Sequence, residues 1–265
     1  MVSRTYEVGG HRFGIRTDSM AFCGWLDRTF RRYRVAGEEY PRYSILIAGA
    51  KGDTGGKQFN ILYKQTSALV RTMDLSTLAR ALVVEMESLS YRERDDAIYT
   101  ELGMLKANGT TALVPGRFTS FLGRLGHRQI ERAGVSLPGS MYVAVDPKSG
   151  RAVPAPPHLQ IPEDAFERLG EIGPTNGSSD RVFVEEPSPV DVVFWVDNQS
   201  EVPFHPVGRG FVLSRLWTWT VNAPVIGKTA IEGLTRLVEP TRCYGLQISE
   251  SRVMLENIVT AIKSG

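Results

Sequence analysis

The apolar residues of this chain come in short runs that turn-forming residues interrupt. The longest runs, Ile45–Ala50 and Val192–Val196, fall far below the roughly 20 apolar residues that span a bilayer. The chain also holds 26 glycines and 15 prolines. The short runs exclude a transmembrane helix. With 42% hydrophobic and 23% charged residues the composition is that of an ordinary globular protein, which excludes a disordered chain and a collagen-like chain. We expect a soluble α/β protein.

The net charge and its distribution limit the kinds of molecule that the chain is expected to bind. The 31 Lys+Arg and 29 Asp+Glu residues give a net charge of +2, which argues against nucleic-acid binding through bulk charge. The distribution is uneven, because residues 1–132 carry 20 basic and 14 acidic side chains, whereas residues 133–265 carry 11 and 15. The two halves can therefore attract each other or bind partners of opposite sign.

The two cysteines, Cys23 and Cys243, stand far apart and form no CxxC motif. We expect both to be buried core residues of a protein in the reducing cytoplasm. The N-terminal sequence lacks the charged start and apolar core of a secretory signal, which agrees with a cytoplasmic location.

The four histidines predict no metal site, because they are scattered and form no HxxxH or HExxH motif. A Ser-His-Asp triad stays open, although no G-x-S-x-G motif occurs.

Residues 1–95 are predicted to form a small N-terminal α+β lobe. Its helices are expected from Asp18 to about Tyr33 and from Asp74 to about Ser88, each with apolar residues at helical spacing. The charged link Tyr91–Asp96 marks the boundary. The expected strands are Tyr6–Val8, Arg12–Ile15, Ser44–Ala48, Phe59–Tyr63 and Ser67–Thr72, the first two joined in a hairpin at Gly9-Gly10.

The glycine-rich stretch Gly49–Lys57 has the composition of a phosphate-binding loop. It fails the spacing G-x-x-x-x-G-K-[ST], because Lys51 stands five residues before Gly56 and Gln58 follows Lys57. A solvated hairpin turn is the better interpretation.

Residues 96–265 are predicted to form a second domain. It begins with strands Ile98–Leu105 and Thr111–Val114, which turn at Asn108-Gly109. A helical stretch ending at Gly134 and a strand Met141–Val145 follow, and this order predicts a βαβ unit. Further elements are expected as a polar loop Pro174–Asp180, strands Arg181–Val184, Val190–Val196, Val212–Val221 and Cys243–Ile248, and helices Ile231–Val238 and Ser249–Ile262.

The aromatic residues of this second domain have two interpretations. Leu213, Trp217, Trp219 and Val221 alternate with polar residues, which predicts one apolar face of a strand. Together with Phe194 and Trp195 they are either core residues or the lining of a groove in which aromatic side chains anchor a peptide.

The run from Asn108 to Leu159 resembles the core of the HPr kinase/phosphorylase-like family. It contains a strand ending in L-V-P-G, a helix, a short strand reaching Asp146-Pro147, a turn at Ser149-Gly150 and the motif P-x-P-x-x-L. The Tyr6–Ile15 opening and the closing stretch GLTRLVEPTRCYGLQISESRVMLENI also resemble bacterial members. The resemblance implies that residues 96–265 form a P-loop domain of that type.

The sequence departs from the family at its catalytic positions. With Gly116 aligned to the first glycine of the phosphate loop G-x-x-G-x-G-K-[ST], the later glycines, the lysine and the hydroxyl become Thr119, Phe121, Leu122 and Gly123. The lysine balances phosphate charge and the hydroxyl holds Mg²⁺, so both roles are vacant. The family's carboxylate pair falls on Pro138-Gly139-Ser140, its histidine near Glu101 and its arginine on Pro157.

The resemblance therefore implies a degenerate P-loop domain, a pseudokinase without nucleotide cofactor. Since the ancestral kinases act on a protein or peptide hydroxyl, peptide recognition is the residual activity. Degenerate relatives resemble peptide-binding proteins of ribosomal peptide pathways, such as the crocagin type. The expected partners are a precursor peptide and modifying enzymes, and neither nucleic acid nor membrane. The candidate peptide-binding residues are Arg117, Arg124, His127, Arg128, Trp217 and Trp219.

Four alternatives remain at this point. The arginines near position 120 can also form a solvated helix face, and a peptide can also add as a strand to a sheet edge. The chain can be an atypical kinase or a peptide-modifying enzyme with a rebuilt site, for which Asp146 or Arg117 are available. It can also be a scaffold that forms homo-oligomers.

Overall fold

The computed structural model divides the chain into two compact units. Unit 1 comprises Met1–Ser90 and His158–Gly177, and unit 2 comprises Tyr91–Pro157 and Ser178–Gly265. The structure describes residues 1–49, 59–116, 130, 132–137, 141–162, 164–172, 186–197, 200–247 and 249–263. The predicted turn at Gly49–Lys57, the helical stretch before Gly134 and the segments 174–180 and 181–184 therefore lie largely or wholly outside the described residues.

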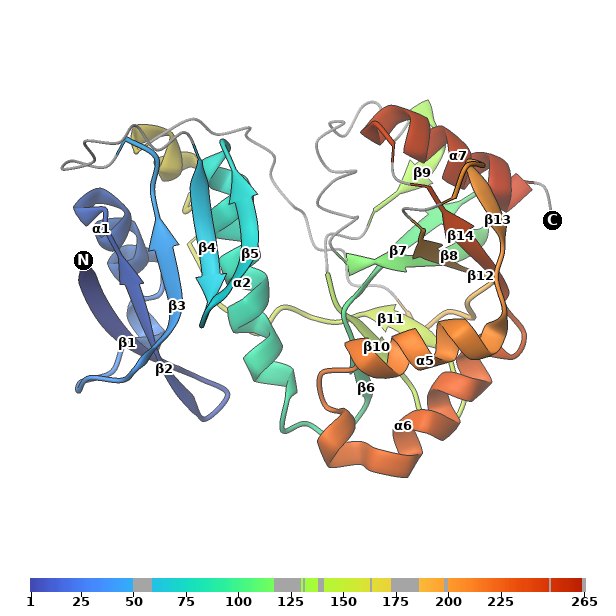
Figure 1. The fold of residues 1–265 in the computed structure, drawn as a ribbon. Helices are drawn as coiled ribbons and strands as arrows, with labels where there is room; N and C mark the ends of the chain where they lie inside the picture. The colour runs from blue at the N-terminus through green and yellow to red at the C-terminus, as the bar shows by residue number, and fades with distance from the viewer. Residues whose placement is uncertain are drawn as a thin grey trace. The chain divides into compact units, whose positions relative to one another are not determined.

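Unit 1 is built on a five-stranded sheet in the order β1-β2-β3-β4-β5 (Figure 1). Its neighbouring strands are antiparallel except for the parallel pair β2–β3. Each strand predicted from the sequence is present, and the hairpin at Gly9-Gly10 is confirmed. The bounds are β1 (Val2–Val8), β2 (His11–Thr17), β3 (Pro41–Leu46), β4 (Asn60–Lys64) and β5 (Ser67–Thr72).

The first helix of unit 1, α1 (Met20–Thr29), begins and ends at other residues than predicted. Its N-cap is Ser19, whose side chain accepts a hydrogen bond from the Phe22 amide. Asp18, the predicted cap, instead accepts from the amide of Ile47 at 2.9 Å. The helix stops at Thr29, and a short 3-10 turn, η1 (Arg31–Tyr33), continues the chain.

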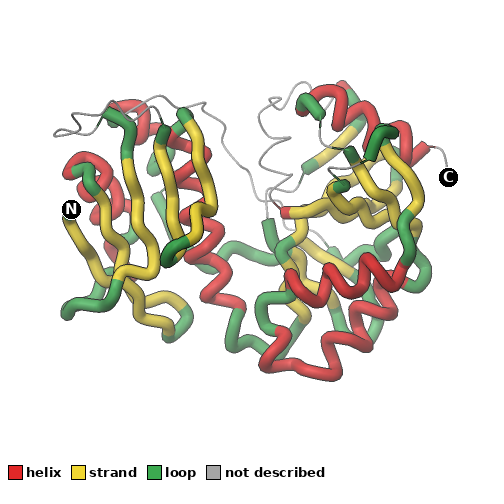
Figure 2. The backbone as a smooth tube through the Cα atoms, viewed as in Figure 1, coloured by secondary structure: helices red, strands yellow, loops and turns green. Residues whose placement is uncertain are grey.

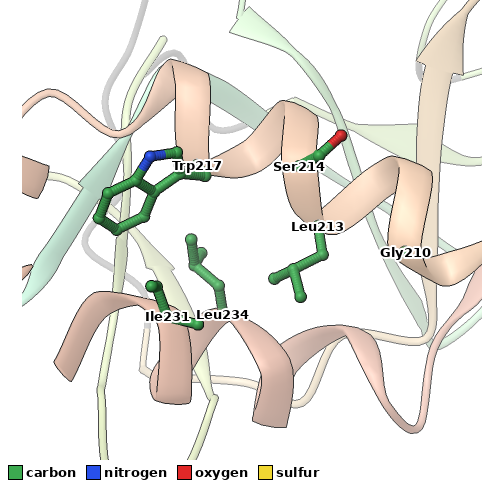
Figure 3. Close-up of a pocket in the computed structure, with 6 residues that line it drawn as sticks. All are labelled: Gly210, Leu213, Ser214, Trp217, Ile231 and Leu234. Carbon is green, nitrogen blue, oxygen red and sulfur yellow. The ribbon is translucent and has the colours of Figure 1, made fainter. Parts of the chain in front are cut away.

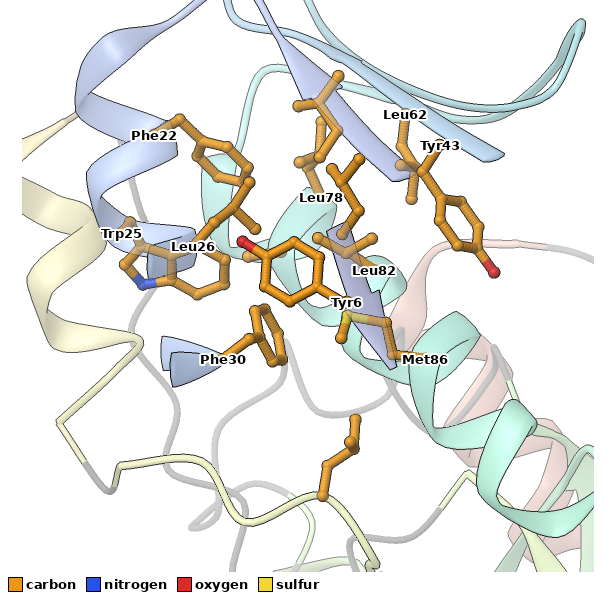
Figure 4. Close-up of a cluster of buried hydrophobic side chains, with 14 of the residues drawn as sticks. Tyr6, Phe22, Trp25, Leu26, Phe30, Tyr43, Leu62, Leu78, Leu82 and Met86 are labelled. Carbon is orange, nitrogen blue, oxygen red and sulfur yellow. The ribbon is translucent and has the colours of Figure 1, made fainter. Parts of the chain in front are cut away.

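The second helix, α2 (Leu75–Tyr91), covers the same face of the sheet as α1. Asp74 caps it as predicted, accepting hydrogen bonds from the amides of Ser76 and Thr77. Figure 4 shows the Tyr6 ring lying among side chains of both helices. The alternating inward positions of the strands and the apolar sides of α1 and α2 together form one core cluster.

A segment distant in sequence completes this core. Leu159 and Leu169 are buried in it, the latter within the 3-10 helix η3 (Glu167–Glu171). The indole nitrogen of Trp25 donates to the carbonyl oxygen of Ala165 at 2.7 Å. Leu159, Ala165 and Leu169 belong to the predicted second domain 96–265, whereas in the structure they are part of unit 1.

Unit 2 contains two sheets. The larger has the order β13-β14-β12-β8-β7-β9 and the smaller β11-β10-β6. In the larger sheet β8, β12 and β14 are parallel, and the other pairs are antiparallel. The bounds are β6 (Ile98–Thr100), β7 (Leu102–Ala107), β8 (Thr110–Pro115), β9 (Val135–Ser136), β10 (Val143–Val145), β11 (Ala152–Pro154), β12 (Val192–Val196), β13 (Phe204–Pro206) and β14 (Arg242–Leu246).

The pairing confirms one predicted motif of unit 2 and corrects another. The hairpin β7–β8 turns at Asn108 and Gly109, whose φ angles of +53° and +78° suit such a turn. The predicted βαβ unit is wrong, because β8 and β10 belong to different sheets. β10 instead pairs with β6 and β11, both antiparallel.

Helices cover both faces of the larger sheet (Figure 2). The helices α5 (Arg209–Trp219) and α6 (Ala223–Val238) share one core cluster with the smaller sheet. The helix α7 (Ser251–Lys263) packs with the opposite face in a second cluster. The predicted helix Ser249–Ile262 is thus confirmed, and α6 extends the predicted helix Ile231–Val238 toward its N-terminus, with a kink at Gly227, whose backbone is not helical. No helix among the described residues is long and apolar enough to cross a membrane.

The predicted strand Val212–Val221 is wrong, because residues 209–219 form α5. Val212 and Leu216, one helical turn apart, are its buried residues. Only the end of the predicted strand is extended, where Thr220 bridges to Thr100 of β6. The chain then turns at the buried Asn222, whose side chain accepts from the Tyr99 amide and donates to the carbonyl oxygens of Arg94 and Ala97.

Candidate functional site

The candidate site is an open hollow between α5 and α6 in unit 2. Its volume is about 290 Å³, which is near the lower end of the range for ligand pockets. Leu213 points from α5 toward α6, whereas Ile231 and Leu234 rise from α6 toward α5 (Figure 3). The lining residues are Gly210, Leu213, Ser214, Trp217, Ile231 and Leu234. We call this hollow the α5–α6 groove.

The groove has a buried floor and an exposed apolar rim. Leu234 is fully buried and belongs to the core of unit 2, so the floor is fixed by packing. Trp217 is 38% exposed and Ile231 is 47% exposed, and both stand at the edge. An exposed tryptophan beside an apolar hollow is typical of a binding surface, because its large area is costly to leave in water.

A cluster of aromatic rings occupies the other side of α5. The rings of Trp219 and Trp195 lie with their centres 4.1 Å apart, and Phe211 meets Trp195 edge-on at 6.2 Å. The guanidinium of Arg215 lies 5.2 Å from the centre of the Phe211 ring and 5.8 Å from that of Trp195. These residues form the aromatic cluster, which packs α5 against the end of β12.

The helical hairpin of residues 207–238 is positively charged. It carries four basic side chains and one acidic side chain, Glu232, although residues 133–265 as a whole are acidic. Lys228 pairs with Glu232 at 3.3 Å, and Arg236 donates to the carbonyl oxygen of Pro147. Arg209 and Arg215 form no ion pair with a carboxylate among the described residues. The helix α5 therefore carries two cations, Arg209 and Arg215, that have no ion-pair partner among the described residues.

The structure separates the two tryptophans that the sequence analysis placed on one face. On a helix, residues 217 and 219 point about 200° apart, because each step turns by about 100°. Trp217 accordingly stands in the groove and Trp219 in the aromatic cluster. The predicted single apolar face is therefore wrong. The other predicted binding residues, Arg117, Arg124, His127 and Arg128, lie outside the described residues.

Sequence reasoning missed Ile231 and Arg215. With residues 209–219 as a helix, positions 210, 213, 214 and 217 share the side that faces Ile231 of α6, and Arg215 falls on the other side. The alternation of aromatic and polar residues favours a strand, so the groove could not be assembled from the sequence.

The end of β8, where the family resemblance places a phosphate loop, is described up to Gly116. A Cβ atom at Gly116 would lie 2.5 Å from the carbonyl oxygen of Met141, so close backbone packing requires glycine here. Its amide donates to the carbonyl oxygen of Glu101 at 3.2 Å. This glycine therefore serves packing within unit 2. Thr119, Phe121, Leu122 and Gly123 lie outside the described residues.

One Ser-His-Asp arrangement occurs after β12. The Nε2 atom of His205 lies 3.3 Å from Oδ2 of Asp197, and its Nδ1 atom lies 3.2 Å from the Ser200 hydroxyl. That hydroxyl donates to the carbonyl oxygen of Val202 and accepts from the Val202 amide. Ser200 thus closes its own turn, which does not suit a nucleophile.

The cysteines and the metal-binding residue types point to no other reactive centre. Cys23 and Cys243 are both buried as predicted, and burial raises the pKa of each thiol. A raised pKa keeps the thiol protonated and unreactive. Within the described ranges, no group of three or more His, Cys, Asp or Glu side chains could hold a metal ion.

In the part of unit 2 that the structure describes, the groove and the aromatic cluster on either side of α5 are features that suit ligand binding. Comparison of the chain with protein-family models, with curated proteins and with solved structures gave no match.

Proposed function

We propose that this chain is a non-catalytic peptide-binding protein. In this proposal it is a degenerate relative of the HPr kinase/phosphorylase-like family that binds a ribosomally made precursor peptide and presents it to partner enzymes. The observation that carries the proposal is the α5–α6 groove, with Trp217 exposed at its rim. The family resemblance supplies the expectation that the ligand is a peptide.

The composition of the groove supports peptide binding. Tryptophan and arginine dominate the binding energy of protein interfaces, and both occur on α5. A groove between two helices accepts the apolar side chains of a short segment, which is a common mode of peptide recognition. The volume of about 290 Å³ suits one or two large side chains better than a whole cofactor.

The sequence supports the absence of kinase chemistry. Leu122 stands at the position of the phosphate-binding lysine and Gly123 at that of the Mg²⁺-binding hydroxyl. An active kinase with a rebuilt site is the competing function. It requires nucleotide binding, so titration calorimetry with ATP and Mg²⁺ separates the two. Micromolar affinity for the nucleotide would overturn the pseudokinase proposal.

The direct test uses synthetic peptides encoded by short reading frames beside the gene. We expect one of them to bind the intact protein with a Kd below about 100 μM, measured by fluorescence polarisation. Trp217→Ala should weaken this binding about thirtyfold, because it removes the apolar rim. Tyr40→Ala is the matched control, since it removes an aromatic ring that is 86% exposed in unit 1.

Two results would count against the proposal. One is the lack of binding by any of these peptides at about 100 μM. The other is equal affinity of the wild type and Trp217→Ala. Light scattering of the protein with and without peptide also tests the scaffold alternative, which requires an oligomer whose size is independent of peptide.

A further inference from the structure

The position of Arg215 narrows the class of peptide that the site can take. Its guanidinium lies over the rings of Phe211 and Trp195 and has no carboxylate partner among the described residues. A cation–π contact of this kind involves the charge of the guanidinium and none of its N–H groups as donors to another residue. These donors match the two oxygens of a carboxylate, which arginine binds in a bidentate manner.

The other basic residues of the hairpin are less suited to this role. Lys228 is paired with Glu232, and Arg236 donates to a backbone carbonyl. Arg209, the first residue of α5, has no ring against it among the described residues that would hold its guanidinium in place. Among the described residues of the hairpin, Arg215 is thus the cation that two neighbouring rings contact and that has no carboxylate partner.

The outer surface of α5 connects Arg215 with the groove. Residues 215 and 217 lie on opposite sides of the helix, and Ser214 and Thr218 stand between them. The Ser214 hydroxyl donates to the Phe211 carbonyl and the Thr218 hydroxyl to the Ser214 carbonyl. Both side chains are small and turned onto their own helix. A chain can therefore cross α5 here without displacing bulky side chains.

We propose that Arg215 binds a carboxylate of the peptide, so that the ligand is an acidic peptide crossing α5. A large apolar side chain of the peptide fills the groove beside Trp217, and an Asp or Glu pairs with Arg215. Crossing a helix about 10 Å wide takes roughly three extended residues. The recognition element is then a large apolar residue and an acidic residue about three positions apart. This inference rests on the proposed function and specifies its ligand.

A random library of 12-residue peptides displayed on phage and selected on the intact protein tests the inference, because it samples acidic and neutral sequences alike. We expect enriched sequences to carry Asp or Glu about three positions from a large apolar residue. Changing that acid to Asn or Gln in a synthetic copy should weaken binding ten- to a hundredfold, as expected for hydrogen bonds to a charged group.

Variants of Arg215 then assign the carboxylate contact. Arg215→Gln should weaken binding of the acidic peptide to the same extent, and should bind the amide version no worse than the wild type does. Arg215→Lys keeps the charge without the planar fork and should fall between them. Arg252→Gln is the matched control, because Arg252 is an exposed arginine of α7 on the opposite face of the sheet.

The outcomes separate this inference from the proposed function. No enrichment at all, or enrichment that Trp217→Ala leaves unchanged, overturns both. Enriched peptides without an acidic residue, or equal loss with acid and amide peptides on Arg215→Gln, overturn the carboxylate contact alone. Binding to vesicles of phosphatidylglycerol and phosphatidylcholine that displaces the acidic peptide would instead identify this surface as a membrane contact. Circular dichroism of each variant establishes that it is folded.

Discussion

Gly233 stands inside α6 at a position where a methyl group has no room. A Cβ atom there would lie 2.4 Å from Cδ1 of Ile98 and 2.8 Å from Cα of Pro147. The sequence marks this glycine only as a residue of poor helix propensity. The structure gives the reason for it, because α6 approaches the backbone after β10 at this point.

Two glycine substitutions should therefore change stability in opposite directions. Gly233→Ala is expected to destabilise unit 2 by about 1–2 kcal/mol, since overpacking outweighs the better helix propensity of alanine. Gly210→Ala in α5 meets no atom within 4 Å and should stabilise by up to about 1 kcal/mol. Calorimetric Tm values of the two variants test this. A rise in Tm for both would show that the approach of α6 to Pro147 is not tight.

Asp96 makes the free energy of unfolding depend on pH. The Arg94 guanidinium donates to it at 2.8 Å, and this contact lowers the pKa of Asp96 to about 2. Since the folded pKa is below the usual value near 4, the contact contributes stability above about pH 4. That contribution is lost as the pH falls from about 4 to 2.

Asp96→Asn should accordingly lower stability at pH 7 by less than about 1 kcal/mol, because both side chains are partly exposed to solvent. The difference from the wild type should shrink as the pH falls toward 2. Urea unfolding at pH 7, 4 and 2.5 measures it. A difference that is the same at all three values would contradict this origin.

The helix α2 and the segment after β11 are joined by one carboxylate. The side chain of Glu87, which is 8% exposed, accepts hydrogen bonds from the amides of His158 and Leu159. At the start of the returning segment, residues 158–172, two backbone amides thus have their hydrogen-bond acceptor on one residue of α2. Loss of the carboxylate leaves them without an acceptor in a site that is largely closed to water.

Glu87→Ala should therefore loosen the segment 158–172 before it affects the sheet of unit 1. Hydrogen exchange is expected to become faster at the amides of His158 and Leu159, with little change in β1–β4. Glu85→Ala is a suitable comparison, because Glu85 pairs with Lys64 on β4 instead. Equal effects of the two variants on residues 158–172 would contradict the role of Glu87.

The elements of unit 1 could largely be predicted from the sequence, because their signals are local. Gly9-Gly10 marks the tight turn between β1 and β2, and Asp74 marks the start of α2. Asn108-Gly109 is a local signal of the same kind in unit 2. The helix α5 could not be predicted, because its aromatic and β-branched residues favour strands. Val212 and Leu216 form its buried side only because β12 and α6 lie beneath them, which is a tertiary effect.

The pairing of strands that lie far apart in the sequence could not be predicted either. Apolar residues indicate the strands near Val114 and Val143, but nothing in their sequences shows that they belong to different sheets. The groove could not be predicted for the same reason, because it depends on α5 being a helix and on the position of Ile231 in α6. Local patterns thus predicted elements, whereas the site depends on their arrangement.

Unit 1 is built from two stretches of the chain that are separate in sequence. A fragment of residues 1–95 lacks Leu159 and Leu169 of the core and the carbonyl acceptor of Trp25. We expect this fragment to be much less stable than unit 1 in the intact chain, because several buried apolar contacts and one buried hydrogen bond are lost. Urea unfolding followed by Trp25 fluorescence tests this, with the fragment compared with an intact chain whose other three tryptophans are replaced by phenylalanine. A fragment as stable as the intact unit would show that residues 158–172 are dispensable.

This discontinuity sets an order of events during protein synthesis. The ribosome makes the five strands of unit 1 first, but the residues that close its core arrive only after residue 158. Residues 91–157, which supply β6 to β11, emerge in between and begin to collapse while unit 1 is still open. The two units are therefore completed in overlapping periods of translation. A pause before residue 172 would leave Trp25 exposed, because residues 158–172 cover its surface.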